Sequence, residues 1–305
     1  MNAAVIGASR QISIARVPVP RPAANEVRIA VEGSGVCASS LPLWQGRDWF
    51  HYPAAPGAPG HEGWGIIDAV GSDVRDLKRG QRVAFLSNNA FAELDVAPAD
   101  GVVVLPAALD GRLFPGEAIA CAMNAFRRSD IAAGQTVAVI GIGFLGAILV
   151  RLAADAGARV IAISRRKFAL DLARDFGAET TIPLDEEPQV ECDRVIEATG
   201  LQGPLDLAGK IVRERGRLII AGYHQDGHRT VDMQLWNWKG LDVVNAHERE
   251  RAAYVRGMHD AVDAVTSGRL DLDRLYTPHR FSNIEHAFRA LEERPDGFVK
   301  AVVTI

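Results

Sequence analysis

The stretch that decides the fold runs from Thr136 to Gly146 and reads TVAVIGIGFLG. Its first part is a continuous apolar run rich in Val, which is typical of a buried strand. The second part, GIGFLG, is a G-x-G-x-x-G pattern, and residues 144–157 continue with helical spacing up to a glycine. A glycine-rich turn between a strand and a helix is the pattern of a dinucleotide-binding fold.

Each glycine of this turn has a physical role in such a fold. Gly141 permits the tight turn, Gly143 lets the backbone approach a pyrophosphate, and Gly146 lets the helix and the strand pack closely. The start of the helix also offers unpaired N–H groups and a partial positive charge. We therefore predict cofactor contacts at Gly141, Gly143, Phe144, Leu145 and Gly146. A glycine-rich turn of some other α/β fold is the alternative.

Working outward, strand-like and helix-like segments alternate on the C-terminal side of the turn. The strand-like segments are 158–164, 192–200, 217–222 and 241–246, and the helix-like ones are 167–178 and 203–216. This alternation predicts a doubly wound parallel sheet, a Rossmann domain, over residues 125–265. The first third instead holds short Val- and Ile-rich strands separated by loops, and the residues after 254 resemble it. We expect a second, mainly β domain built from 1–124 and 266–305.

The end of the second strand of a dinucleotide fold indicates which cofactor is bound. A fold that prefers NAD places Asp or Glu there, but this chain has Ser164, Arg165 and Arg166. Two guanidinium groups suit a 2′-phosphate, so NADP is favoured over NAD. The alternative is that both arginines are a solvated helix start.

Three separated residues raise the question of a metal. Cys37, His61 and Cys121 could converge from loops of one domain. Two thiolates and an imidazole are a ligand set of catalytic zinc with an open fourth position. From spacing alone, a metal site is the less favoured alternative, because lone cysteines are more often small buried apolar residues.

The segments GVCASS (35–40), GHEGWG (60–65), EAIACAMNAF (117–126) and GIGFLG (141–146) together resemble the zinc-dependent medium-chain dehydrogenase/reductase family. The likeness covers essentially the whole chain, including the closing DGFVKAVVTI. It implies an α/β protein with a GroES-like, mainly β catalytic domain and a Rossmann domain. The implied activity is hydride transfer between NADP(H) or NAD(H) and an alcohol, a polyol or the corresponding carbonyl, in the cleft between the domains.

The resemblance also implies roles for individual residues. The family's catalytic zinc ligands fall on Cys37, His61 and Cys121. Glu62 falls on a carboxylate that ligates the metal in polyol-type members, and Glu117 on a further acidic position near the metal. Ser39 matches the hydroxyl residue that takes the proton of the substrate. The aromatic residues expected to line the substrate pocket are Trp44 and Trp49.

Three departures from the family pattern change these expectations. Ser40 stands where the family usually has an Asp that orients the ligating His, and Pro42 replaces a relay His. The segment 81–94 runs through the place of the cysteine-rich lobe that holds a structural zinc, and three cysteines cannot supply the four thiolates of that zinc. We therefore predict one zinc per chain, at the catalytic site.

Composition narrows the remaining classes. The chain has 305 residues, of which 48% are hydrophobic and 24% charged, with a net charge of -4. We expect no nucleic-acid or membrane partner, and widely spaced, unpaired cysteines predict a cytoplasmic protein. The apolar edge segment 241–246 predicts a homodimer. A zinc-free quinone or ene reductase of the same superfamily, or a non-catalytic dinucleotide-binding protein, stays open as an alternative.

Overall fold

The computed structural model describes residues 1–186 and 188–305. The chain divides into two compact units, one formed by Met1–Ala120 with Glu250–Ile305 and the other by Cys121–Arg249. The domain boundaries expected from the sequence, at 124 and 265, differ from this division by 4 and 16 residues and stay a prediction. Both units mix strands and helices, which confirms the α/β class.

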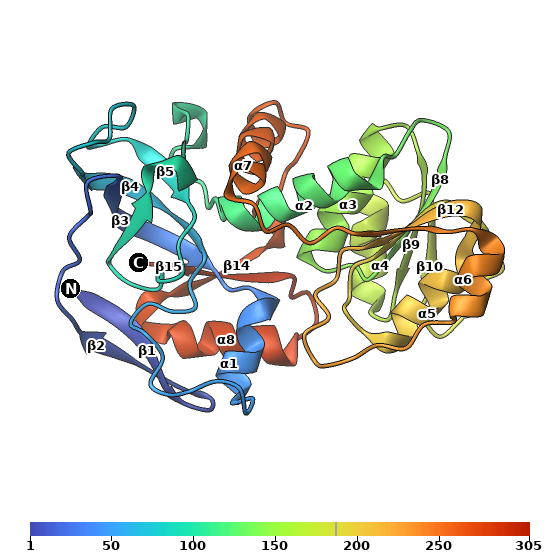
Figure 1. Cartoon of the computed structure of the whole chain (residues 1–305), viewed down its shortest axis with the longest axis horizontal. Coiled ribbons are helices and arrows are strands. Elements are labelled where there is room, and N and C mark those ends of the chain that lie inside the picture. Colours follow the sequence, from blue (N-terminus) through green and yellow to red (C-terminus); the bar gives the residue numbers. More distant parts are fainter. Residues whose placement is uncertain (187) are drawn as a thin grey trace. The chain divides into compact units, whose positions relative to one another are not determined.

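The first unit is built mainly from strands (Figure 1). Its strands are β1 (Asn2–Ala8), β2 (Gln11–Arg16), β3 (Glu26–Gly35), β4 (Glu62–Val70), β5 (Arg82–Phe85), β6 (Leu94–Pro98), β7 (Val102–Val104), β14 (Tyr276–Arg280) and β15 (Lys300–Thr304). Within the described residues, β14-β15-β3-β4-β5-β7 form one sheet, with β6 also paired to β3, while β1 and β2 form a hairpin. The C-terminal strand β15 therefore returns to the first third of the chain and pairs with β3.

Helices cover this sheet and close two apolar cores. The helices are α1 (Leu41–Gln45), α7 (Arg251–Thr266) and α8 (Ile284–Glu293), and α2 (Gly116–Ser129) begins in this unit. One core lies between α1, α8 and β15 and includes Trp44, Phe91 and Phe288. The other lies along β3, β4 and β5. Together these cores anchor the ends of β3 and β4, where the predicted metal ligands are found.

The second unit is a doubly wound parallel sheet. Its strands are β8 (Thr136–Ile140), β9 (Arg159–Ser164), β10 (Thr180–Pro183), β11 (Cys192–Glu197), β12 (Val212–Ile220) and β13 (Asp242–Asn245). Their order in the described part of the sheet is β10-β9-β8-β11-β12-β13, all parallel. The strands β8, β9 and β10 form one mononucleotide-binding half, and β11, β12 and β13 form the other. The halves meet between β8 and β11, which is the switch point of a Rossmann fold.

Within the described residues, helices connect successive strands of this sheet (Figure 1). They are α3 (Phe144–Asp155), α4 (Lys167–Asp175), α5 (Gln202–Ile211) and α6 (Met233–Lys239). α3 and α4 pack on the β8–β10 half, and α5 and α6 pack on the β11–β12 half. The predicted alternation of strands and helices is therefore confirmed.

Three details differ from the sequence expectation. The helix expected over 203–216 ends at Ile211, and the charged residues that follow belong to the long strand β12. The short strand β10 carries no strong sequence signal. Cys121 lies on the helix α2 and not on a loop.

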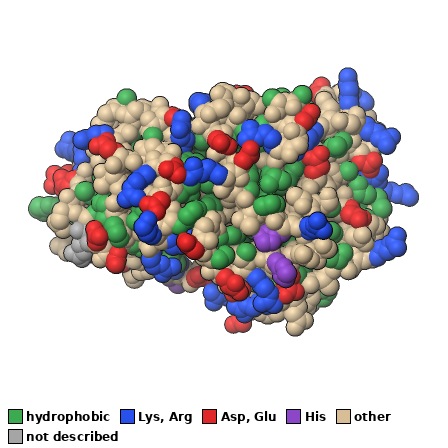
Figure 2. All heavy atoms as spheres, turned by 180° about the vertical axis from the view of Figure 1, so that it is seen from behind, with side chains coloured by type: hydrophobic (Ala, Val, Ile, Leu, Met, Phe, Trp, Pro, Cys, Tyr) green, Lys and Arg blue, Asp and Glu red, His purple; other side chains and the backbone are tan. Residues whose placement is uncertain are grey.

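Charged side chains of both signs are interspersed on the face of the molecule drawn in Figure 2. This agrees with the small net charge of -4.

Among the described residues, no helix has the length and apolar character that crossing a membrane requires.

Candidate active site

The pairing of β3 and β4 brings three candidate metal ligands together. In this antiparallel pair Gly35 lies opposite Glu62. Cys37 follows the end of β3, and His61 directly precedes the start of β4. Residues that lie just beyond paired strand ends are close in space, although 24 positions separate Cys37 from His61 in the chain.

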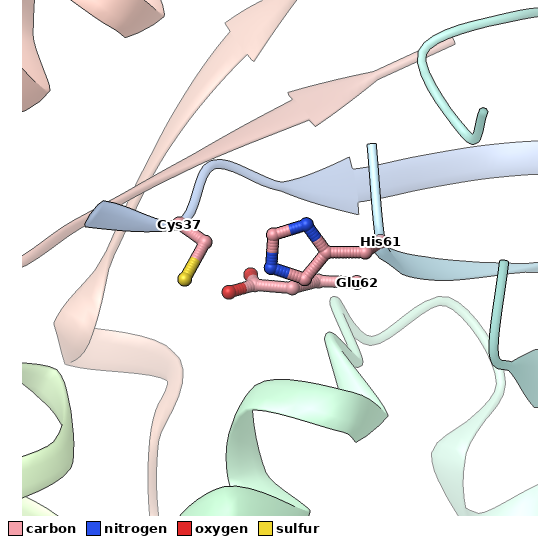
Figure 3. Close-up of side chains that lie close together, drawn as sticks. All are labelled: Cys37, His61 and Glu62. Atoms are coloured by element: carbon pink, nitrogen blue, oxygen red, sulfur yellow. The ribbon is translucent and has the colours of Figure 1, made fainter. Parts of the chain in front are cut away.

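The side chains of Cys37, His61 and Glu62 converge on one point (Figure 3). One sulfur, nitrogen or oxygen atom of each lies within 4.8 Å of the others. The ring of His61 is held from behind, because its Nδ1 lies 2.8 Å from the carbonyl oxygen of Pro59. A carbonyl oxygen only accepts, so Nδ1 carries a proton and Nε2 is the atom available for a metal.

Glu62 is fully buried and is paired with a cation from the last strand. Nζ of Lys300 donates to Oε1 of Glu62 at 2.8 Å and lies 2.7 Å from Oε2. The approach to Oε2 is too poorly aligned for a hydrogen bond, so within the described residues this oxygen has no hydrogen-bond partner. A Cβ at Gly35 would lie 1.8 Å from Oε2, so only glycine leaves room for this carboxylate.

The three candidate ligands lie in a negatively charged environment. Burial lowers the pKa of His61, but the charges of Cys37, Glu117 and Glu62 outweigh burial and raise the pKa to about 10. Burial likewise lowers the pKa of Lys300, and the same acidic groups, Glu62 first, raise it above its ordinary value. A pocket that retains protons on its bases in this way also attracts a metal cation.

These residues fit a zinc ion. A thiolate, an imidazole with its Nε2 turned inward and a carboxylate are all zinc ligands. Oε2 of Glu62, which accepts no hydrogen bond within the described residues, and the held orientation of His61 are what a bound cation would use. The prediction that Glu117 lies near the metal is supported by its charge acting on His61.

The residues after Cys37 occupy the short helix η1 (Ala38–Ser40). Oγ of Ser39 lies 3.5 Å from Nε2 of His61, the ring nitrogen that is turned away from Pro59. Ser40 is buried, and within the described part of the chain its Oγ has no hydrogen-bond partner. The orienting contact that the family takes from an Asp at this position is therefore supplied here by the carbonyl group of Pro59.

Cys121 belongs to the second unit, one residue beyond the boundary at Ala120. On α2 it lies one helical turn after Glu117 and is partly exposed. Its role as a zinc ligand stays a prediction. Cys192 is buried in β11, and burial raises the pKa of its thiol to about 12, which makes it an inert core residue.

The glycine-rich turn of the second unit fits a dinucleotide. It joins β8 to α3 as predicted, and Gly141 has a φ of 97°, which favours glycine. A Cβ on Gly146 would lie 2.0 Å from the carbonyl oxygen of Gly141, whereas one on Gly143 would meet nothing within 4 Å. The space over Gly143, at the start of α3, is where a pyrophosphate would approach the backbone.

Ser164, the last residue of β9, and the two arginines that follow it lie as predicted at the carboxyl end of this strand. Ser164 is buried, Arg165 is exposed and Arg166 is half-buried. Nη2 of Arg166 donates to the carbonyl oxygen of Ile142 at 3.4 Å, so this guanidinium lies against the glycine-rich turn.

The two tryptophans expected to line a substrate pocket differ. Trp44 has no exposed surface; its ring stacks on Phe288 at 5.2 Å and its Nε1 donates to Glu292 at 2.9 Å. The structure thus places Trp44 in the core, contrary to the expectation of an accessible wall. Trp49 is 57% exposed, and its pocket-lining role stays a prediction.

Lys300 and Pro59 are site residues that the sequence reasoning missed. Lys300 begins the closing apolar run KAVVTI, and a single cation at the head of a buried strand is a signal that could have indicated a buried anion. The part played by the Pro59 carbonyl group has no sequence signal, because any residue has such a group.

Comparison with known proteins identifies the family. Residues 23–107 match the alcohol dehydrogenase GroES-like domain, and residues 145–264 match the zinc-binding dehydrogenase domain. An alcohol dehydrogenase of Moraxella sp. (strain TAE123) is 30% identical over 73% of this chain and 77% of its own length. The galactitol 1-phosphate 5-dehydrogenase of Escherichia coli K12 is 30% identical over 68% of this chain and 70% of its own length.

Solved structures share the fold of the whole chain. A short chain alcohol dehydrogenase (RspB) of Escherichia coli CFT073, solved with NADH, superposes with a TM-score of 0.90 at 22% identity, over 100% of this chain and 99% of its own. The two domain matches, the curated relatives and the converging ligands of the first unit agree. The chain belongs to the zinc-binding alcohol dehydrogenase branch of the medium-chain dehydrogenase/reductase family of oxidoreductases.

Proposed function

We propose that this oxidoreductase is a zinc-dependent dehydrogenase that interconverts an alcohol or polyol with its carbonyl compound by using NADP(H) or NAD(H). The observation that carries the proposal is the convergence of Cys37, His61 and Glu62 within 4.8 Å. A chain that only bound a dinucleotide would have no evident need for this set of ligands. The curated relatives, which are alcohol and polyol-phosphate dehydrogenases, support the substrate class.

In the proposal, Cys37, His61 and Cys121 hold one zinc ion per chain, and Glu62 is an alternative oxygen ligand. A bound zinc ion would supply Lewis acidity toward the substrate oxygen, and a bound nicotinamide would supply the chemistry of hydride transfer. Pro59 holds the ring of His61 through Nδ1, so that Nε2 is the nitrogen that would ligate the metal. Lys300 compensates the charge of Glu62 while that carboxylate is not a ligand.

Proton transfer is assigned to Ser39. Its Oγ lies on the Nε2 side of His61, at 3.5 Å, where it could accept from the hydroxyl group of a bound alcohol. Oγ accepts the proton of the substrate hydroxyl group and passes its own proton on to solvent. Pro42 is buried and has no titratable group, so the exit route differs from that of a relay His.

We also propose NADP as the preferred cofactor. The support is the absence of a carboxylate at Ser164, together with the position of Arg166 against the glycine-rich turn. A homodimer that pairs two copies of β13, and a cytoplasmic location suited to three free thiols, complete the proposal.

Metal analysis combined with turnover tests the zinc proposal. We expect one zinc per chain in the wild type, and loss of both zinc and turnover in Cys37→Ser, with an unchanged circular dichroism spectrum. Cys192→Ala is the matched control, because this thiol is buried in the other unit; it should keep zinc and activity.

The result also separates the rival functions. Turnover of a quinone or an enone by Cys37→Ser at the wild-type rate would favour a zinc-free reductase. Dinucleotide binding without turnover of any alcohol, in zinc-loaded protein, would favour a non-catalytic binding protein.

A further inference from the structure

A buried acid–base cluster stands at the carboxyl end of the β11–β12 half of the second unit. Glu197, the last residue of β11, is fully buried. Oε1 of Glu197 accepts from the backbone N–H of Thr199 at 2.6 Å and of Gly200 at 3.0 Å, and also from the hydroxyl group of Thr199. The carboxylate therefore holds the loop that follows its own strand.

The second oxygen of Glu197 binds a histidine from another loop. Nε2 of His224, four residues after the end of β12, lies 3.0 Å from Oε2 of Glu197. On the other side of the ring, Nε of Arg229 donates to Nδ1 of His224 at 3.1 Å. Nη2 of Arg229 in turn donates to the carbonyl oxygen of Gly200 at 2.9 Å. The cluster thus joins the loop after β12 to the loop after β11 at two points.

These contacts define the protonation of the imidazole. Arg229 has only donors, so Nδ1 of His224 must accept, and Nε2 then carries the proton that it donates to Glu197. In this tautomer His224 bridges the buried carboxylate of Glu197 and the partly exposed guanidinium of Arg229. A second proton on the ring would be carried by Nδ1, which would then be a donor that faces another donor, Nε of Arg229.

The loop after β11 abuts the glycine-rich turn, and the loop after β12 packs on the loop after β11. A Cβ on Gly141 would lie 2.3 Å from Cγ2 of Thr199, so the loop after β11 packs directly on this turn. A Cβ on Gly222 would lie 2.2 Å from the backbone nitrogen of Gly200, so the two loops also touch each other without space for a side chain. Displacing the loop after β12 would therefore disturb the edge of the turn.

The topology indicates which part of a dinucleotide this edge would meet. A Rossmann sheet binds one half of the cofactor over each mononucleotide-binding half, on either side of the switch point. Arg166, at the end of β9, lies on the β8–β10 half, where the adenosine end with its 2′ position belongs. The loops after β11 and β12 belong to the half beyond the pyrophosphate, which takes the nicotinamide end.

We propose that His224 is a positioning residue that locks the loop after β12 onto the loop after β11 and thereby shapes the nicotinamide end of the cofactor site. The proposal rests on the proposed cofactor use. Between Gly222 and His224, Tyr223 is 52% exposed and stacks on His247, from the segment after β13, with ring centroids 5.3 Å apart. The lock on His224 therefore also sets the position of this exposed aromatic pair.

Binding of whole cofactor and of cofactor fragments tests the proposal. Dissociation constants for NADPH and NADH are measured by fluorescence, and those for ADP-ribose and 2′-phospho-ADP-ribose, which lack nicotinamide, by calorimetry. In His224→Phe we expect the whole cofactor to bind about tenfold more weakly, because hydrogen bonds to a buried carboxylate and from a guanidinium are lost. Fragment binding should stay within about twofold of the wild type, since the adenosine half is untouched.

Three further variants complete the experiment. His228→Phe is the matched control, because His228 is an exposed histidine of the same loop, and it should bind the whole cofactor normally. His224→Gln retains an amide donor for Glu197 and should recover part of the affinity. Arg229→Gln keeps every donor of Glu197 and should weaken whole-cofactor binding alone, which serves if His224→Phe does not fold.

The outcomes separate this proposal from its premise. Equal weakening of whole cofactor and fragments would indicate a merely structural role and overturn the proposal, as would normal binding in His224→Phe and Arg229→Gln, or equal losses in His228→Phe. If the wild type bound neither NADPH nor NADH, the proposed function itself would fail and the inference with it.

Discussion

At the scale of single residues, cofactor choice depends on side chains at the carboxyl end of β9. We expect wild-type protein to have a lower KM for NADP than for NAD. The double substitution Ser164→Asp with Arg165→Ala should reverse this preference, because it adds a partner for the ribose hydroxyl groups and removes a guanidinium. Steady-state kinetics with both cofactors measure the change. Lys167→Ala, at an exposed position on α4, is the control, and a strong wild-type preference for NAD would refute the role of Arg165.

A second residue-scale prediction concerns Glu292, which accepts from Arg10, Trp44 and Gln45. Its hydrogen bond with Arg10 first, and those with Trp44 and Gln45, lower the pKa of this carboxyl group from 4.5 to about 2. A pKa lowered by folding stabilises the folded state above the unfolded value and loses that contribution as the pH falls through the folded value. The contribution of Glu292 to the free energy of unfolding is thus complete above pH 4.5 and disappears toward pH 2.

Urea unfolding as a function of pH measures this contribution. Glu292→Gln should unfold at lower urea than the wild type at neutral pH, and the difference should shrink between pH 4.5 and about 2. Glu293→Gln, at the exposed neighbouring position, is the control and should follow the wild type. A difference between Glu292→Gln and the wild type that did not depend on pH would show that the carboxylate charge plays no part.

At the scale of elements, two glycines of the turn between β8 and α3 have different roles, one in cofactor binding and the other in packing. Gly143 has an extended backbone conformation, with φ of -101°, and open space where a Cβ would lie. Gly143→Ala should therefore keep the wild-type melting temperature and bind NADPH about tenfold more weakly, because the methyl group occupies the approach of the pyrophosphate.

Gly146→Ala in the same turn should behave differently. Its Cβ would lie 2.0 Å from the carbonyl oxygen of Gly141, so α3 must shift away from β8. The free energy of unfolding should fall by about 1–3 kcal/mol, as for overpacked cores, and cofactor binding should fall too. Thermal and urea unfolding with parallel binding measurements distinguish the two variants; equal stability losses would contradict the separate roles of the two glycines.

At the scale of the whole molecule, the end of the second unit's sheet bears on assembly. Val243 of β13 is 42% exposed, and on the neighbouring helix α6 Trp238 is 83% exposed. Exposed apolar side chains beside an edge strand favour pairing with a second copy, which would continue the sheet through a twofold axis. We expect a dimer by light scattering at micromolar concentration. Val243→Pro, which removes a backbone donor, should shift it toward monomer.

Two results would argue against this assembly. A monomeric wild type would refute the dimer outright. A Val243→Pro protein that stayed dimeric, with intact circular dichroism, would place the contact elsewhere. Val104→Pro, at a similarly exposed position of β7 in the other unit, is the matched control and should leave the oligomeric state unchanged.

Features that depend on local pattern can be predicted from the amino-acid sequence. The strand, glycine turn and helix at 136–155 follow from apolar continuity, from the backbone freedom of Gly141 and from helical spacing, all of which are properties of neighbouring residues. The candidate ligands Cys37 and His61 were predicted by residue type and by family resemblance. The prediction of a helix over 203–216 is wrong after Ile211. The charged segment that follows has an ambiguous periodicity, and in the structure it pairs with β11 as a strand.

Contacts between residues that are distant in the chain depend on the three-dimensional packing. The register of β3 against β4 places Glu62 opposite Gly35, and the return of β15 brings Lys300 to it across 238 positions. The hydrogen bond between His224 and Glu197 likewise joins residues that are distant in the chain. Such contacts are made by strand pairing and by the satisfaction of buried charges, and both depend on the whole packed chain and not on any local segment.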